Sequence, residues 1–135
     1  MKILQNRTAP RYQRDNITSY LLVSSLTCDS KKLTITLVDM APGGIQKIHA
    51  HEPEQMYFLL EGEGIMTVNG EEEKIGAGDC VFFDSFAEHG LENTGTTRLR
   101  YLSAASPSFS KDDCLKLWPL ASQQQEGEYS LNPAD

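Results

Sequence analysis

The chain contains three histidines, and two of them, His49 and His51, are separated by a single residue. In a β-strand, residues i and i+2 point to the same face, so these two imidazoles can converge on one ion. Neutral imidazole is the commonest metal ligand among protein side chains. The spacing alone leaves two interpretations open, which are a metal site and a pair of surface histidines that form a satisfied polar pair.

An oxygen ligand can follow the histidine pair in the sequence. If the alternation of faces continues through the turn at residues 52–54, the side chain of Gln55 lies on the same face as the histidines, and its amide oxygen can bind a metal. Glu54 would then point away, although its carboxylate is a rival oxygen ligand. Because Pro53 interrupts the strand, both residues stay open as the oxygen ligand.

The elements that must position these residues are predicted to be short β-strands. Residues 33–37, LTITL, alternate apolar and polar side chains, and turn residues recur at short intervals between residues 17 and 104. The pair Asn69-Gly70, between IMTV and EEEKI, predicts a two-residue hairpin, because a type I′ turn needs positive φ at both central positions. This pattern predicts an all-β domain, either a sandwich or a barrel.

The length of 135 residues is typical of one compact domain. We expect an N-terminal arm at residues 1–16, a single barrel domain at residues 17–118 and a polar tail at residues 119–135. Residues 111–118, KDDCLKLW, are predicted to form a turn or two of helix. The strand-like segment ITSYLLVSSLT at residues 17–27 offers an unpaired sheet edge, from which we predict a homodimer.

The composition excludes several classes of partner. With 19 acidic and 12 basic residues the net charge is -7, which argues against a protein that binds nucleic acid through its phosphates. The first 16 residues lack the apolar core of a signal peptide, and no apolar stretch approaches about 18 residues, so we expect a cytoplasmic protein with no membrane partner. Cys28, Cys80 and Cys114 are widely spaced and are expected to be free thiols.

The segments around the histidines resemble the two motifs of the cupins. The first motif of that family is G-x5-H-x-H-x3-E-x6-G, and at these intervals the chain has Gly43, His49, His51, Gln55 and Gly62. The second is G-x5-P-x-G-x2-H-x3-N, and at these intervals the chain has Gly78, Asp84, Phe86, His89 and Asn93. Gln55 therefore replaces the glutamate of the first motif. In the second motif, Asp84 replaces the proline and Phe86 replaces the second glycine. The resemblance covers roughly residues 33–105.

The resemblance implies a small antiparallel β-barrel of the jelly-roll, or double-stranded β-helix, type. It also implies one divalent transition metal inside the barrel, held by His49, His51, Gln55 and His89. Three imidazoles and an amide suit iron, manganese, nickel and zinc, so the ligand set does not identify the metal. Because all four ligands are neutral, the ion keeps its full charge, which favours anionic or chelating ligands and weakens the binding of the metal itself.

The resemblance further implies a metalloenzyme acting on a small chelating oxygenated or carboxylated metabolite, of the dioxygenase or the sugar or uronate isomerase type. The alternative is a non-catalytic cupin that binds a small molecule. Tyr57 shares the face of Gln55 and is a catalytic candidate, although a core tyrosine has the same pattern. Arg98 and Arg100 share one face of the last strand, and Arg100 is the second candidate because arginine can clamp a carboxylate. Solvent-facing arginines are the competing interpretation.

Overall fold

The computed structural model describes residues 1–117, apart from the side chain of Leu117. Its first elements are η1 (Asn6–Thr8), β1 (Arg11–Arg14), β2 (Ile17–Val23), β3 (Thr34–Met40), β4 (Ile45–His49) and β5 (Glu54–Glu61). These are followed by β6 (Glu63–Val68), β7 (Glu71–Gly76), β8 (Cys80–Phe83), β9 (His89–Glu92), β10 (Leu99–Ser106) and α1 (Lys111–Leu117). The predicted tail at residues 119–135 lies outside the described residues.

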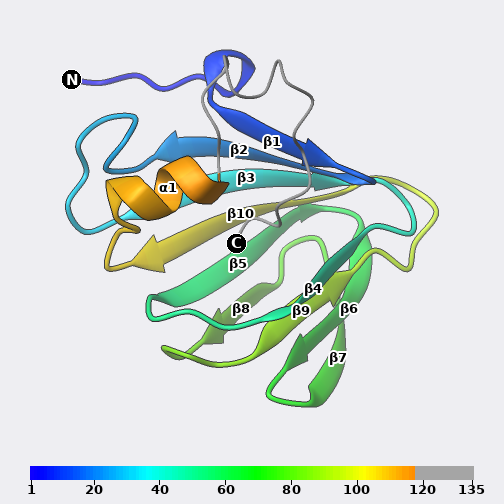
Figure 1. The fold of residues 1–135 in the computed structure, drawn as a ribbon. Helices are drawn as coiled ribbons and strands as arrows, with labels where there is room; N and C mark the ends of the chain where they lie inside the picture. Colours follow the sequence, from blue (N-terminus) through cyan, green and yellow to red (C-terminus); the bar gives the residue numbers. More distant parts are fainter. Residues whose placement is uncertain (118–135) are drawn as a thin grey trace.

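The strands form two antiparallel sheets that face each other (Figure 1). The larger sheet has six strands in the order β1-β2-β3-β10-β5-β8, and the smaller has four in the order β4-β9-β6-β7. This arrangement confirms the predicted all-β fold of jelly-roll type. The two sheets are not joined into one continuous ladder within the described residues, so the barrel is an open one.

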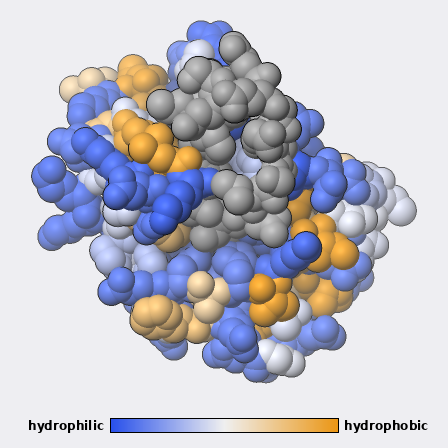
Figure 2. Space-filling view, viewed as in Figure 1, coloured by the Kyte–Doolittle hydropathy of each residue, from blue (hydrophilic) through white to orange (hydrophobic). Residues whose placement is uncertain are grey.

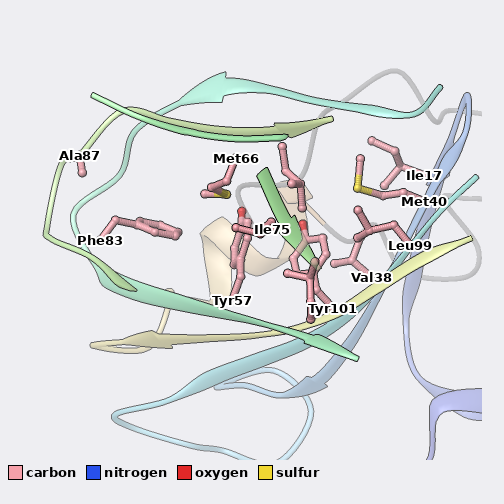
Figure 3. Packing of buried hydrophobic residues seen from close by; sticks show 12 residues of the cluster. Ile17, Val38, Met40, Tyr57, Met66, Ile75, Phe83, Ala87, Leu99 and Tyr101 are labelled. Atoms are coloured by element: carbon pink, nitrogen blue, oxygen red, sulfur yellow. The ribbon is translucent and has the colours of Figure 1, made fainter. Parts of the chain in front are cut away.

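The core fills the space between the sheets because alternate residues of each strand point inward. In β10, Leu99 and Tyr101 are buried while the residues between them are partly exposed. Figure 3 shows Tyr57 and Tyr101 in the middle of this core, with Phe83 toward one end and Leu99 toward the other. The inward face of the larger sheet therefore carries the aromatic side chains that surround the histidines.

A second, smaller cluster lies where α1 packs against the N-terminal strands. It consists of buried side chains from β1, β2, β10, α1 and the segment before α1, namely Tyr12, Leu21, Ala105, Phe109 and Cys114. Helix α1 confirms the helix predicted at residues 111–118. Since Tyr12, Leu21 and Ala105 belong to the inward face, α1 covers the inner side of the larger sheet at that end.

The hairpin predicted at Asn69-Gly70 is confirmed. The two residues have φ values of 49° and 83°, and they join β6 to β7, in which Val68 is opposite Glu71. Positive φ at both positions is the signature of the type I′ turn.

The N-terminal edge differs from the expectation. Residues 11–14 of the predicted arm form β1, which pairs along its length with β2. Strand β2, from the segment expected to be an open edge, is therefore paired on both sides, by β1 and β3. The edge prediction placed there is wrong because a short polar strand, RYQR, covers it. No helix within residues 1–117 is long and apolar enough to cross a membrane.

Candidate metal centre

The fold brings the three histidines together. His49 is the last residue of β4, His89 is the first residue of β9, and the two are directly opposite each other in the pairing of these strands. His51 follows in the connection to β5. One potential ligand atom from each imidazole lies within 4.8 Å of the others. The ring centroids are 4.3 Å apart for His49 and His89 and 5.0 Å apart for His51 and His89.

Backbone carbonyl groups orient all three imidazoles. In each ring Nδ1 donates to the carbonyl oxygen of a residue two positions away: His49 to Lys47 at 2.7 Å, His51 to Pro53 at 3.2 Å and His89 to Ala87 at 2.9 Å. A carbonyl oxygen only accepts hydrogen bonds, so Nδ1 must carry the proton. The lone pair of each neutral ring is therefore on Nε2, which is the tautomer needed for metal binding through that atom.

The donor atoms fit a divalent metal ion. Nε2 of His49 and Nε2 of His89 are buried and have no hydrogen-bond partner among the described residues. A buried polar atom without a partner costs about 1–3 kcal/mol, and an ion between the rings would satisfy both atoms. Imidazole nitrogen suits iron, manganese, nickel and zinc alike.

Burial keeps His89 neutral. Its side chain is fully buried, and removal from water lowers its pKa from the ordinary 6.5 to about 3, although the hydrogen bond to Ala87 acts in the opposite direction. The electrostatic contributions to this pKa come from His49 and His51, and no carboxylate contributes. At neutral pH the His89 ring is therefore uncharged.

Gln55 points into the barrel, as the count across the Pro53 turn predicted. The side chain is buried, and its Nε2 donates to Oγ of Ser103 on β10. This bond fixes the amide and leaves Oε1 buried without a hydrogen-bond partner. Glu54 is exposed on the other face of β5. Between the two candidates, only Gln55 is on the inward face, and its role as a metal ligand stays a prediction.

Aromatic rings form the wall around the histidines. Phe83 stacks on His89 with ring centroids 4.0 Å apart, and Phe109 meets His51 edge-on at 5.3 Å. Tyr57 is fully buried, with its ring 6.0 Å from that of His89. Tyr57 therefore lies beside the centre as expected, while its catalytic role stays a prediction. No sequence pattern indicates a role for Phe109, because this residue lies outside both motifs.

Arg100 lies away from the centre. It alternates with the buried Tyr101 on β10, and its guanidinium donates to both carboxylate oxygens of Asp39, at 2.6 Å and 3.0 Å. Arg98, on the same outward side, pairs with Glu61 at 2.9 Å. A catalytic part for Arg100 stays an untested prediction, and its ion pair with Asp39 gives it a structural role on the outer face.

The loop before His89 is tied to the segment that carries His51. The backbone N–H of Phe86, a residue with a φ of 63°, donates to the carbonyl oxygen of His51 at 2.8 Å, and Oγ of Ser85 donates to the carbonyl oxygen of Glu52. These bonds hold the two motif segments side by side. They connect the segment that carries His51 to the loop that leads to His89.

Comparisons with known proteins agree with this fold. The family model described as "Cupin domain" matches residues 36–105. An oxalate-binding protein of Thermotoga maritima is 37% identical over 83 residues, which are 61% of this chain and 69% of that protein. The dimethylsulfoniopropionate lyase DddW of Ruegeria pomeroyi is 32% identical over 89 residues, 65% of this chain and 58% of that protein. A crystal structure described as a predicted oxalate decarboxylase from Thermotoga maritima has a TM-score of 0.69 and 27% identity, and it covers 78% of this chain and 99% of that one.

Proposed function

The chain belongs to the cupin family, and we propose that it is a metal-dependent cupin whose histidine centre binds a small chelating carboxylate. The observation that carries this proposal is the convergence of three imidazoles, each oriented by a backbone carbonyl oxygen that accepts a hydrogen bond from Nδ1. Gln55 is proposed as the fourth ligand through its buried amide oxygen.

The residues of the centre favour an anionic ligand. A divalent ion held here would supply a Lewis-acid centre for carboxylate or carbonyl oxygens. The proposed ligands are all neutral, so none of them offsets the charge of the ion. Phe83 and Phe109 cover part of the rings of His89 and His51, and electrostatic attraction is stronger in a partly enclosed site than in open water.

The similar proteins support a carboxylate as the ligand of the centre. Their names also suggest two kinds of activity, which are ligand binding and catalysis. The Thermotoga maritima relative is named for binding oxalate, a small dicarboxylate that can chelate a metal. The Ruegeria pomeroyi relative is named as a lyase. We favour a metalloenzyme, with dioxygenase, isomerase or lyase chemistry, and we retain a non-catalytic carboxylate-binding cupin as the second candidate.

Metal analysis tests the centre directly. Protein purified without a nickel column should contain about one divalent transition metal per chain, and single alanine variants of His49, His51 and His89 should each lose most of it. The chain has no other histidine, so the three variants cover every imidazole. A triple alanine variant that retained a stoichiometric ion would place the metal elsewhere.

Calorimetric titration with oxalate tests the ligand class. Metal-loaded protein should bind oxalate, and protein stripped with a chelator should not, while acetate should bind far more weakly because it offers one carboxylate. Retention of oxalate affinity after metal removal would contradict the proposal.

Turnover assays separate the two kinds of activity. Dioxygen consumption by iron-loaded protein would indicate an oxygenase, and activity that persists anaerobically with zinc or manganese would indicate an isomerase or lyase. Binding without turnover across a broad panel of oxygenated and carboxylated metabolites would leave the binding protein as the function.

A further inference from the structure

Buried polar side chains inside the barrel extend beyond the metal centre. Hydrophilic residues cover most of the surface seen in Figure 2, as expected for a protein with an apolar interior. Inside the barrel, however, Arg14 of β1, Ser19 of β2 and Gln46 of β4 are all buried, and we refer to these three residues as the inner polar cluster. Arginine is rarely buried unless it is paired, so its presence in the interior requires a specific reason.

The members of the inner polar cluster lie close to one another. Nη2 of Arg14 donates to Oε1 of Gln46 at 2.5 Å, and this bond joins the edge strands β1 and β4 of the two sheets. The guanidinium of Arg14 also lies over the ring of Tyr12, 5.0 Å from its centroid. Because Tyr12 is directly opposite Ser19 in the pairing of β1 with β2, the positive charge lies at the level of Ser19.

The cluster faces the same interior as the histidines. In the pairing of β4 with β9, Gln46 is opposite Leu91 and His49 is opposite His89. Leu91 and His89 are two residues apart and therefore share one face of β9. Their partners Gln46 and His49 consequently share a face of β4. The register shift between Gln46 and His49 makes this possible, since residues three apart in a regular strand point to opposite faces.

The spacing along β4 sets the size of a ligand that could touch both the cluster and the centre. At about 3.3 Å per residue, Gln46 and His49 leave the strand roughly 10 Å apart. Oxalate, whose two carboxylates are bonded directly to each other, is too short to reach from the histidines to the guanidinium, whereas a diacid of about five carbons fits this spacing. Oγ of Ser19 is buried without a hydrogen-bond partner among the described residues, so it can donate to such an anion.

We propose that Arg14, with Ser19 and Gln46, forms a second subsite that binds the distal carboxylate of a chelating diacid whose other end lies at the histidine centre. This proposal rests on the proposed function and narrows its ligand class to dicarboxylates longer than oxalate. Arginine suits this role because its planar guanidinium can donate two parallel hydrogen bonds to one carboxylate. Oxalate would occupy only the centre, so its binding does not depend on this subsite.

Calorimetric titration with two acids that differ only at the distal end tests the subsite. The probes 2-hydroxyglutarate and 2-hydroxypentanoate offer the same hydroxy acid for chelation, but only 2-hydroxyglutarate carries a second carboxylate. Metal-loaded wild-type protein should bind 2-hydroxyglutarate more tightly by about tenfold or more. Arg14→Gln should remove most of this preference, and Arg14→Lys, which keeps the charge without the planar guanidinium, should retain part of it.

Arg11→Gln is the matched control, because Arg11 is on the outward face of the same strand, where its guanidinium lies 4.9 Å from the centroid of the Tyr20 ring. This variant should keep the full preference.

Three results would overturn the subsite and leave the metal centre standing. They are equal binding of both acids by the wild type, a full preference in Arg14→Gln, and loss of the preference in Arg11→Gln. If Arg14→Gln does not fold, a full preference in Arg14→Lys overturns the proposal in its place. If neither acid binds metal-loaded protein, the proposed function fails together with the subsite.

Discussion

The imidazoles of the centre are oriented by backbone carbonyl oxygens of Lys47, Pro53 and Ala87. A carbonyl holds the ring and fixes the tautomer without adding negative charge. Metal-bound histidines in other proteins commonly donate to a carboxylate, which raises their basicity. At the scale of single residues, the centre is therefore neutral both in its proposed ligands and in the groups that hold its histidines.

Adding one charge at Gln55 should change this balance. Gln55→Glu places a carboxylate where the buried amide oxygen lies, and Ser103 can donate its hydroxyl proton to it. We expect tighter metal binding and weaker oxalate binding, each by about tenfold or more, because one unit of charge is added beside the ion. Metal and oxalate titrations of the two proteins measure both effects.

Glu54→Gln is the control for this experiment, since it removes a charge from the adjacent but exposed position. Both affinities should stay close to those of the wild type. If Gln55→Glu changed neither affinity, Gln55 would not be a ligand.

The burial of His89 predicts a pH dependence of stability in metal-free protein. Its pKa is about 3 in the folded chain and near the ordinary 6.5 in the unfolded chain. As the pH falls below 6.5, the unfolded state takes up a proton that the folded state does not, so stability decreases, by at most about 1.4 kcal/mol per pH unit. Urea unfolding at several pH values in the presence of a chelator measures the slope.

His89→Gln should reduce that slope by the equivalent of one proton, because the substituted side chain does not titrate. An unchanged slope would mean that His89 is protonated in the folded state over the same range as in the unfolded state.

Sequence reasoning found the histidines because their types, their i and i+2 spacing and the motif intervals agree. It could not decide which face Arg100 occupies. Leu99 and Tyr101 on one face of β10 and Leu102 on the other are all apolar, so alternation alone does not identify the inward side. Phe109 was missed for a different reason, since it reaches His51 from a segment that has no regular pattern.

At the scale of elements, two turns with the same backbone conformation should respond differently to substitution. Gly62 and Gly70 have φ values of 86° and 83°. A Cβ at Gly70 would meet nothing within 4 Å, whereas one at Gly62 would lie 2.5 Å from the carbonyl oxygen of Arg98. Gly70→Ala should cost about 1 kcal/mol for the left-handed conformation, and Gly62→Ala about 1–3 kcal/mol more for the overlap. Urea unfolding of both variants measures the difference.

Gly76→Ala is a suitable reference, because Gly76 does not have positive φ and its added Cβ would approach only the carbonyl oxygen of Gly62, at 3.8 Å. Its effect should be within about 0.5 kcal/mol. Equal losses for Gly62→Ala and Gly70→Ala would show that the backbone near Arg98 yields to the added group.

The hairpin at Asn69-Gly70 could be predicted because both its turn residues and its strands are local in the sequence. Strand β1 could not be predicted from the sequence, because RYQR has little apolar character of its own and is held in place by its pairing with β2. Long-range pairing had no local signal either. Tyr101 on β10 is opposite Val38 on β3, more than sixty residues earlier, and such a pairing was expected only through the resemblance to a known family.

At the scale of the whole molecule, the two sheets serve different purposes. The smaller sheet carries His49 and His89 on paired strands, and the larger sheet supplies Gln55, Tyr57 and Phe83 from its inward face. The residues of the centre therefore come from both sheets, and only folding brings them together.

This arrangement predicts that metal binding stabilises the fold. Folded protein holds the histidines together, while the unfolded chain separates His89 from the other two, so an ion binds the folded state preferentially. At a free metal concentration about 1,000 times the dissociation constant, the free energy of unfolding should rise by about 4 kcal/mol. For a domain of this size, the melting temperature should increase by roughly 10 °C or more. Differential scanning calorimetry with zinc or manganese measures the increase.

Oxalate extends the same experiment to the ligand. With metal present, oxalate should raise the melting temperature further, and without metal it should have no effect, because its proposed binding requires the ion. The triple variant His49→Ala, His51→Ala, His89→Ala should respond to neither. A metal-dependent increase in that variant would locate the ion outside the centre. An increase with oxalate alone in metal-free wild-type protein would show that the carboxylate binds the protein directly, and the coupling between metal and ligand proposed here would be wrong.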